Sequence, residues 1–132
     1  MPGPLSGVRV LDLTGVVSGP YATMFLADQG ADVLKIEPIG GEPVRQRESV
    51  SRGSGAPFAM LNGHKQCITL DLKAAKGKDI LKRLAKDADV LLENYAPGVM
   101  DRLGVGWSVL HELNPRLVYA SGSGYGITGP DK

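Results

Sequence analysis

Short runs of apolar residues alternate along this chain with segments whose apolar residues recur at helical spacing. Five runs rich in Val, Leu and Ile predict strands, at residues 8–13, 32–37, 67–71, 90–94 and 117–121. The segments between them predict helices, at residues 18–30, 59–62, 76–87, 99–103 and 108–113. Strands that are apolar almost throughout and are separated by helices are typical of a parallel sheet with helices on both faces. The pattern therefore predicts an α/β fold, with Ser18 as the N-cap of the first helix.

Polar and glycine-rich segments follow the predicted strands. In parallel sheets, ligands bind beyond the carboxyl ends of the strands, and the segments at these ends are residues 14–20, 37–41, 94–98 and 122–130. Residues 38–55 form a long stretch dense in Gly, Pro, Ser and Arg, whose length is typical of a functional flap or a mobile segment. We expect a ligand cleft at this rim of the sheet.

Residues 124–129 read Gly-Tyr-Gly-Ile-Thr-Gly and match the G-x-G-x-x-G pattern. The dinucleotide fingerprint belongs on the first strand of a fold and opens a helix, whereas Pro130 follows here. We therefore interpret the match as a decoy. The segment is either a glycine-rich loop that lines a ligand cleft or a flexible turn.

The turn at residues 94–98 contains Asn94, Tyr95 and Pro97 and is followed by Arg102. If a helix begins at about Pro97, Arg102 lies just over one turn into it and could reach a phosphate near the helix start. The alternative is a capped turn with a solvated Arg102. Residues 14–20 leave a similar choice, between an anion site at a helix start and an ordinary strand-to-helix turn.

Composition narrows the class of protein. The chain has 132 residues, 42% apolar and 22% charged, which is typical of one compact domain and not of a disordered segment. The net charge of +1 gives no indication of a nucleic-acid partner, and no apolar run approaches membrane-spanning length. The single cysteine, Cys67, excludes an internal disulfide and a multi-cysteine zinc site. We expect Cys67 to be a buried, inert thiol in a cytoplasmic protein.

Five blocks of sequence, taken in order, resemble a known family: PLSGVRVLDLT, VSGPYATMFLADQGADVLKIEP, ITLDLK, ADVLLENYAPGVMDRLG and NPRLVYASGSGYGITGP. They are similar to the opening of the family III CoA-transferases (CaiB/BaiF type), which include formyl-CoA and carnitine CoA-transferases and are related to alpha-methylacyl-CoA racemases. The resemblance implies that residues 1–132 are the N-terminal part of a Rossmann-like large domain. It also implies an interlocked homodimer, coenzyme A (CoA) as the bound group, and no metal.

The resemblance also implies which residues contact ligands. In relatives, CoA is held at the positions of Val16, Val17, Ser18, Glu37, Leu72, Lys73, Asn94, Tyr95 and Arg102, and the loop of Gly124, Tyr125 and Gly126 is the expected substrate loop. Two positions depart from the family pattern. Formyl-CoA transferases carry a Gln where this chain has Val17, so formyl specificity is not implied. Some relatives place a phosphate-binding Arg at the position of Pro38, for which Arg45 or Arg52 is a candidate replacement.

The resemblance implies CoA transfer from an acyl-CoA to a carboxylic acid, through an anhydride and a thioester formed on an aspartate. That aspartate, the small domain and the C-terminal return to the large domain are expected beyond Lys132, so no catalytic residue is assigned here and residues 1–132 alone are expected to be inactive. Two alternatives stay open. One is 2-methylacyl-CoA racemisation by a downstream His and Asp, and the other is a nucleotide-binding or CoA-binding Rossmann module without catalysis.

Overall fold

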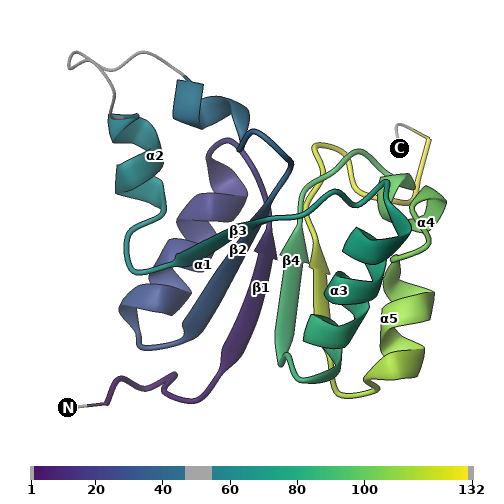
Figure 1. Ribbon diagram of the computed structural model, residues 1–132, viewed down its shortest axis with the longest axis horizontal. Helices are drawn as coiled ribbons and strands as arrows, with labels where there is room; N and C mark the ends of the chain where they lie inside the picture. The colour runs from purple at the N-terminus through teal and green to yellow at the C-terminus, as the bar shows by residue number, and fades with distance from the viewer. Residues whose placement is uncertain (1, 47–54, 131–132) are drawn as a thin grey trace.

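The computed structural model describes residues 2–46 and 55–130, which form a five-stranded parallel sheet flanked by helices (Figure 1). The strands are β1 (Arg9–Leu13), β2 (Asp32–Glu37), β3 (Gln66–Thr69), β4 (Val90–Glu93) and β5 (Val118–Ser121). Their order in the sheet is β3-β2-β1-β4-β5, and all neighbouring pairs are parallel. This is the order of the first five strands of a Rossmann sheet, so the predicted α/β fold is confirmed.

The connections between strands are helical. They contain α1 (Ser18–Asp28), the 3-10 turn η1 (Pro43–Gln46), α2 (Ala56–Leu61), α3 (Ala75–Lys86), α4 (Val99–Arg102) and α5 (Trp107–Leu113). Figure 1 shows α1 and α2 on one side of the sheet and α3 and α5 on the other, as the sequence pattern predicts. No helix in the described ranges combines the length and apolar character needed to cross a membrane.

Alternate residues of each central strand face opposite layers of helices. On the α3 and α5 side, Leu11 and Leu91 of the sheet pack with Leu81 and Leu110 of the helices, all nearly inaccessible to solvent. Burying each of these leucines contributes about 1.5–3 kcal/mol. On the α1 side the apolar layer is small and consists of Val10, Ala27, Ala31 and Val33. Toward the carboxyl ends of the strands, this smaller layer is replaced by buried polar side chains.

Two local expectations are wrong. The N-cap of α1 is Val17 and not Ser18, because the Tyr21 N–H already bonds to the Val17 carbonyl and no side chain caps the helix. Cys67 is exposed and not buried, because β3 is an edge strand of the described sheet and is mostly solvent-facing. Partial burial together with the charge of Glu37 nevertheless raises the pKa of the Cys67 thiol. The predicted flap at residues 38–55 contains η1, and its residues 47–54, with Arg52, lie outside the described residues.

Candidate site at the carboxyl ends of the strands

A cavity of about 450 Å³ lies at the carboxyl ends of β2, β3 and β4. Its wall includes Glu37 from the end of β2, Leu72 and Lys73 from the loop after β3, and Tyr95 from the loop after β4. The remaining lining residues are mainly apolar and are Ile36, Pro38, Ile39, Leu70, Asp71, Val99 and Leu103. Four of the nine predicted CoA-binding residues therefore meet around one cavity, whose size suits a small-molecule ligand.

Local hydrogen bonds shape the two loops that enclose this cavity. The Lys73 N–H donates to the Asp71 carboxylate at 2.9 Å, which closes a tight turn after β3. The Tyr95 N–H donates to Oε2 of the buried Glu93 at 2.9 Å. Burial and the charge of Glu93 raise the pKa of Tyr95, so its side chain offers the cavity a neutral phenol.

The loop after β1 lies at the same rim and is joined to the loop after β4. The Asn94 side chain bonds both backbone groups of Gly15: its Oδ1 accepts from the Gly15 N–H at 2.8 Å, and its Nδ2 donates to the Gly15 carbonyl at 2.9 Å. Val16 has a φ of 70°, in the left-handed region that a β-branched residue rarely adopts. Val16, Val17 and Ser18 all face solvent. They do not line the 450 Å³ cavity, and Asn94 connects their loop to it by way of Tyr95.

Arg102 ends the short helix α4, and Val99 of this helix and Leu103 just after it line the cavity. Its guanidinium lies back over the turn that starts this helix, because a Cβ added at Gly98 would be 2.9 Å from Nη1 of Arg102. Gly98 itself has a φ of 78°. Within the described ranges, the exposed Arg102 side chain makes no ion pair. An exposed guanidinium near the helix start is common to both sequence-based alternatives for Arg102, the phosphate contact and the solvated side chain.

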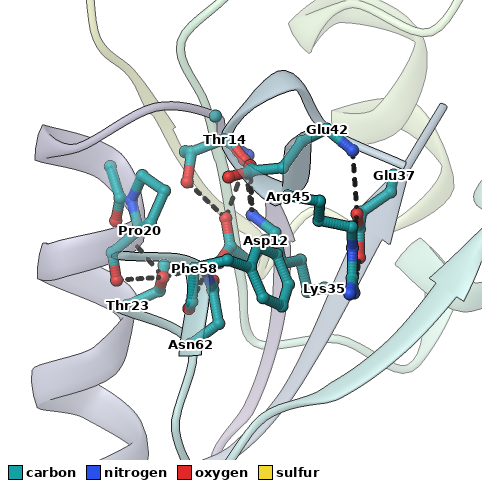
Figure 2. A network of polar contacts seen from close by, with 12 residues as sticks. Asp12, Thr14, Pro20, Thr23, Lys35, Glu37, Glu42, Arg45, Phe58 and Asn62 are labelled. Atoms are coloured by element: carbon teal, nitrogen blue, oxygen red, sulfur yellow. Dashed lines mark hydrogen bonds and ion pairs between the residues drawn. The ribbon is translucent and has the colours of Figure 1, made fainter. Parts of the chain in front are cut away.

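A buried network of charged side chains lies beneath the loop after β1 (Figure 2). One half is centred on Asp12 of β1. Its Oδ1 accepts from the N–H and the hydroxyl of Thr14, and its Oδ2 accepts from the Thr23 hydroxyl at 2.6 Å and from Lys65 Nζ at 3.0 Å. The side chains of Asp12 and Lys65 are both 0% exposed. Lys65 Nζ has three more oxygen partners, on Pro20, Thr23 and Asn62.

The other half of the network joins β2 to η1. Lys35 Nζ donates to the Thr14 carbonyl at 2.8 Å and lies 3.0 Å from Glu42 Oε2. Arg45 donates through Nε and Nη2 to the two oxygens of Glu37, each at 2.6 Å, and its guanidinium stacks 3.6 Å from the centre of the Phe58 ring. Two donors of Arg45 are thus already used by Glu37, and the carboxylate of Glu37 is bound within the protein and not directed to a ligand.

The ionisation of the two central carboxylates reflects these contacts. Burial raises the pKa of Asp12, but Lys35, Thr14, Thr23 and Lys65 together outweigh it, so the pKa of Asp12 is lowered. Glu37 behaves alike: hydrogen bonds from Arg45 and the Glu42 N–H outweigh burial and lower its pKa. Burial also lowers the pKa of Lys65, against the opposing effect of Asp12. Both carboxylates are therefore stabilised in the charged form.

The predicted substrate loop lies beside a second cavity, of about 590 Å³, at the ends of β4 and β5. Gly124, Tyr125 and Gly126 are exposed and do not line it, whereas Ile127 does. Its polar lining includes Glu93 and Tyr119, and burial together with the charge of Glu93 raises the pKa of Tyr119. The G-x-G-x-x-G segment forms bends and follows β5, not the first strand of the sheet, which agrees with its interpretation as a decoy.

Sequence reasoning did not find the buried network. Glu37 and Arg45 are sequence-based candidates, but as ligand contacts and not as partners of each other. The available signal for the other members is an Asp in the middle of one apolar strand and a Lys in the middle of the next. No group of three or more His, Cys, Asp or Glu side chains in the described residues is arranged to hold a metal ion.

A parallel sheet in this strand order, with a ligand-sized cavity beyond its carboxyl ends, defines a Rossmann-like α/β fold. Residues 5–132 match the family described as CoA-transferase family III, so the chain belongs to this family. The sequence resemblance is thereby confirmed.

The relatives carry consistent names. The chain is 46% identical to an acyl-CoA transferase of Fusarium pseudograminearum, across 97% of this chain and 30% of the relative. It is 48% identical to a formyl-CoA:oxalate CoA-transferase of Afipia carboxidovorans, across 92% of this chain and 29% of the relative. The crystal structure of a CAIB/BAIF family protein from Brucella suis superposes with a TM-score of 0.93 at 36% identity, covering 98% of this chain and 36% of that one. The chain thus spans about a third of the length of these proteins.

Proposed function

We propose that the protein carrying this sequence transfers CoA between an acyl-CoA donor and a carboxylic acid acceptor, and that residues 1–132 supply part of the CoA site. The observation that carries the proposal is the cavity at the ends of β2, β3 and β4. Glu37, Leu72, Lys73 and Tyr95 line it together, and these are residues that the family resemblance assigns to CoA. The family membership supports CoA as the substrate class.

The chemistry of the rim suits the parts of CoA. The apolar wall, with Leu72, Val99 and Leu103, suits a flat adenine ring or the carbon chain of pantetheine. Lys73 lines this wall and Arg102 ends the helix that contributes Val99 to it, and both side chains suit phosphate oxygens. The exposed loop of Val16, Val17 and Ser18 offers backbone groups to the pantetheine amides.

The chemical step in the proposed reaction belongs to an aspartate outside these 132 residues. Its carboxylate attacks the thioester carbonyl of the acyl-CoA, which forms a mixed anhydride and releases CoA as the thiolate. The thiolate then attacks the aspartyl carbonyl, which forms an enzyme-bound thioester and frees the donor acid. The acceptor carboxylate reverses these two steps, so a new acyl-CoA leaves and the aspartate is regenerated.

We further propose that the whole protein is an interlocked homodimer in the cytoplasm and that its reaction needs no metal. Residues 1–132 bind and orient CoA without catalysing transfer alone. Because the side chain of Val17 has no hydrogen-bonding group, we propose no formyl specificity.

The test is isothermal titration of the whole protein with CoA and, separately, with NAD. We expect CoA to bind and NAD not to bind. Arg102→Ala should weaken CoA binding about tenfold or more, since a hydrogen bond to a charged group contributes about 1.5–3 kcal/mol. Arg116→Ala, an exposed arginine at the opposite end of the sheet, is the matched control and should leave the affinity unchanged. Equal binding of NAD, or no binding of CoA, would refute the proposal.

A further inference from the structure

Lys35 and Glu42 form a buried ion pair that has no role in the proposed contacts with CoA. The side chain of Lys35 is 0% exposed and that of Glu42 is 4% exposed. Within the described ranges, Oε1 of Glu42 has no hydrogen-bond partner, and its Oε2 meets Lys35 as an ion pair without an aligned hydrogen bond. Replacing a buried ion pair by apolar side chains of similar size is often neutral or stabilising. The pair is therefore better explained by what it positions than by its contribution to stability.

The pair lies directly beneath the loop after β1. Lys35 Nζ donates to the Thr14 carbonyl, and a Cβ added at Gly15 would lie 3.6 Å from Glu42 Oε2. Thr14 is also fixed on its other side, through its N–H, by Asp12. The N–H and the carbonyl of Thr14 are thus held by side chains from below, while Asn94 holds the N–H and the carbonyl of Gly15 from the side.

This support explains how Val16 keeps its left-handed conformation. A non-glycine residue in this region persists only where the surrounding structure over-determines the backbone. With the Thr14 carbonyl fixed inward on Lys35, the chain reverses at Val16 and turns the side chains of Val16 and Val17 outward.

The pair also connects this loop to the loop after β2. The Glu42 N–H donates to Glu37 Oε2 at 2.9 Å, and Glu37 lines the 450 Å³ cavity. Phe58 of α2 covers the pair, with its ring centre 6.0 Å from Lys35 Nζ. A single buried contact between Lys35 and Glu42 therefore relates two loops of the rim.

We propose that Lys35 and Glu42 are positioning residues for CoA binding: Lys35 fixes the Thr14 carbonyl, and Glu42 fixes Lys35 and couples the loop after β1 to the loop after β2. This inference rests on the proposed function in one respect, that CoA is the ligand of these loops. Neither residue touches the ligand, and each acts through the backbone of residues 14–16.

The test uses the double variant K35M/E42Q in the whole protein, because K35M alone would leave a buried carboxylate without its countercharge. We expect the dissociation constant for CoA to rise about tenfold, as the loss of one hydrogen bond to a charged group would produce. We also expect hydrogen exchange of the Gly15 amide to accelerate about tenfold. V33A removes buried side-chain volume from the same strand and face and should change neither quantity.

A second variant covers the case in which the double variant does not fold. E42Q alone keeps Lys35 and one side-chain oxygen near its ammonium. It should also raise the dissociation constant for CoA and accelerate exchange of the Gly15 amide, but by smaller factors. Unchanged CoA affinity together with unchanged Gly15 exchange, in either variant that folds, overturns the inference. If the unmodified protein does not bind CoA, the proposed function fails, and the Gly15 exchange rate alone then decides whether the pair positions the loop.

Discussion

At the scale of single residues, Val16 combines backbone strain with exposure. Its φ of 70° costs on the order of 1–3 kcal/mol for a residue with a Cβ. Val16 is 47% exposed, so packing of its side chain offsets little of that cost. The strain is instead held in place by the hydrogen bonds on Thr14 and Gly15.

We predict that Val16→Gly stabilises the protein by about 1 kcal/mol, because relief of the left-handed strain exceeds the entropy that glycine loses on folding. The measurement is the free energy of unfolding from urea denaturation. Val16→Ala is the matched control, since it removes the same exposed methyl groups but keeps the Cβ, and it should gain less than glycine. Equal gains from the two variants would show that the Cβ is not the source of strain.

At the scale of elements, the position of α3 against the loop after β3 depends on one glycine. Gly77 lies in the first turns of α3 and is buried. A Cβ added there would overlap the carbonyl oxygen of Asp71, the residue that begins the turn to Lys73. The close packing of α3 and the shape of the cavity wall after β3 therefore both depend on the absence of a side chain at Gly77.

We predict that Gly77→Ala destabilises the protein by about 1–3 kcal/mol, even though alanine favours helix by about 1 kcal/mol, because the overlap with backbone forces α3 away from the loop. CoA affinity should fall at the same time, since Leu72 and Lys73 move with the loop. Gly63→Ala is the control: its Cβ would meet the nearest atom, Ala59 O, at 3.8 Å, an ordinary contact. Thermal melting and CoA titration of both variants check the prediction, and a stabilised Gly77→Ala would contradict it.

At the scale of the whole molecule, the buried charged residues connect the elements on the α1 side of the sheet. Asp12 belongs to β1, Lys35 to β2, and Lys65 to the segment just before β3, while Thr23 belongs to α1. The network takes the place of an apolar layer, which is small on this side of the sheet. The stability of the described fold should therefore respond to pH.

We predict that stability is lost as the pH falls below about 4, the range in which Asp and Glu titrate in the unfolded chain. The folded-state pKa values of Asp12 and Glu37 are both lowered. The unfolded chain thus binds protons first, and the stabilisation present above pH 4 disappears as the pH falls through the folded values. Urea denaturation at a series of pH values measures this loss.

The variant Asp12→Asn distinguishes the contribution of the buried network to the pH dependence of stability from that of the remaining carboxylates. It should cost about 3–5 kcal/mol at pH 7, because it leaves the buried Lys65 without its countercharge, and it should flatten the decline in acid. Asp79→Asn, on the exposed surface of α3, should change neither property. If Asp12→Asn lost stability in acid as the wild type does, the assignment of this loss to the Asp12 network would be contradicted.

The hydrophobic pattern predicted all five strands and their parallel arrangement, because a strand buried on both faces needs apolar residues almost throughout. The pattern was less informative about which strand lies at an edge of the sheet. Cys67 sits in an apolar context along the chain, yet β3 lies at the edge of the described sheet and exposes it. The rim was predicted because parallel strands share one carboxyl end, and the family resemblance supplied residues that a periodicity argument does not distinguish.

By itself, the sequence determined the succession of elements, the parallel sheet and the rim that carries the candidate site, because these follow from periodicities and turns within a few residues. The tertiary structure alone decided which charges are paired. Lys65 meets Asp12 across 53 residues and Asn94 meets Gly15 across 79, and these contacts exist only because the strand order places distant segments side by side. Electrostatic partners are fixed by distance in space, which a local pattern does not record.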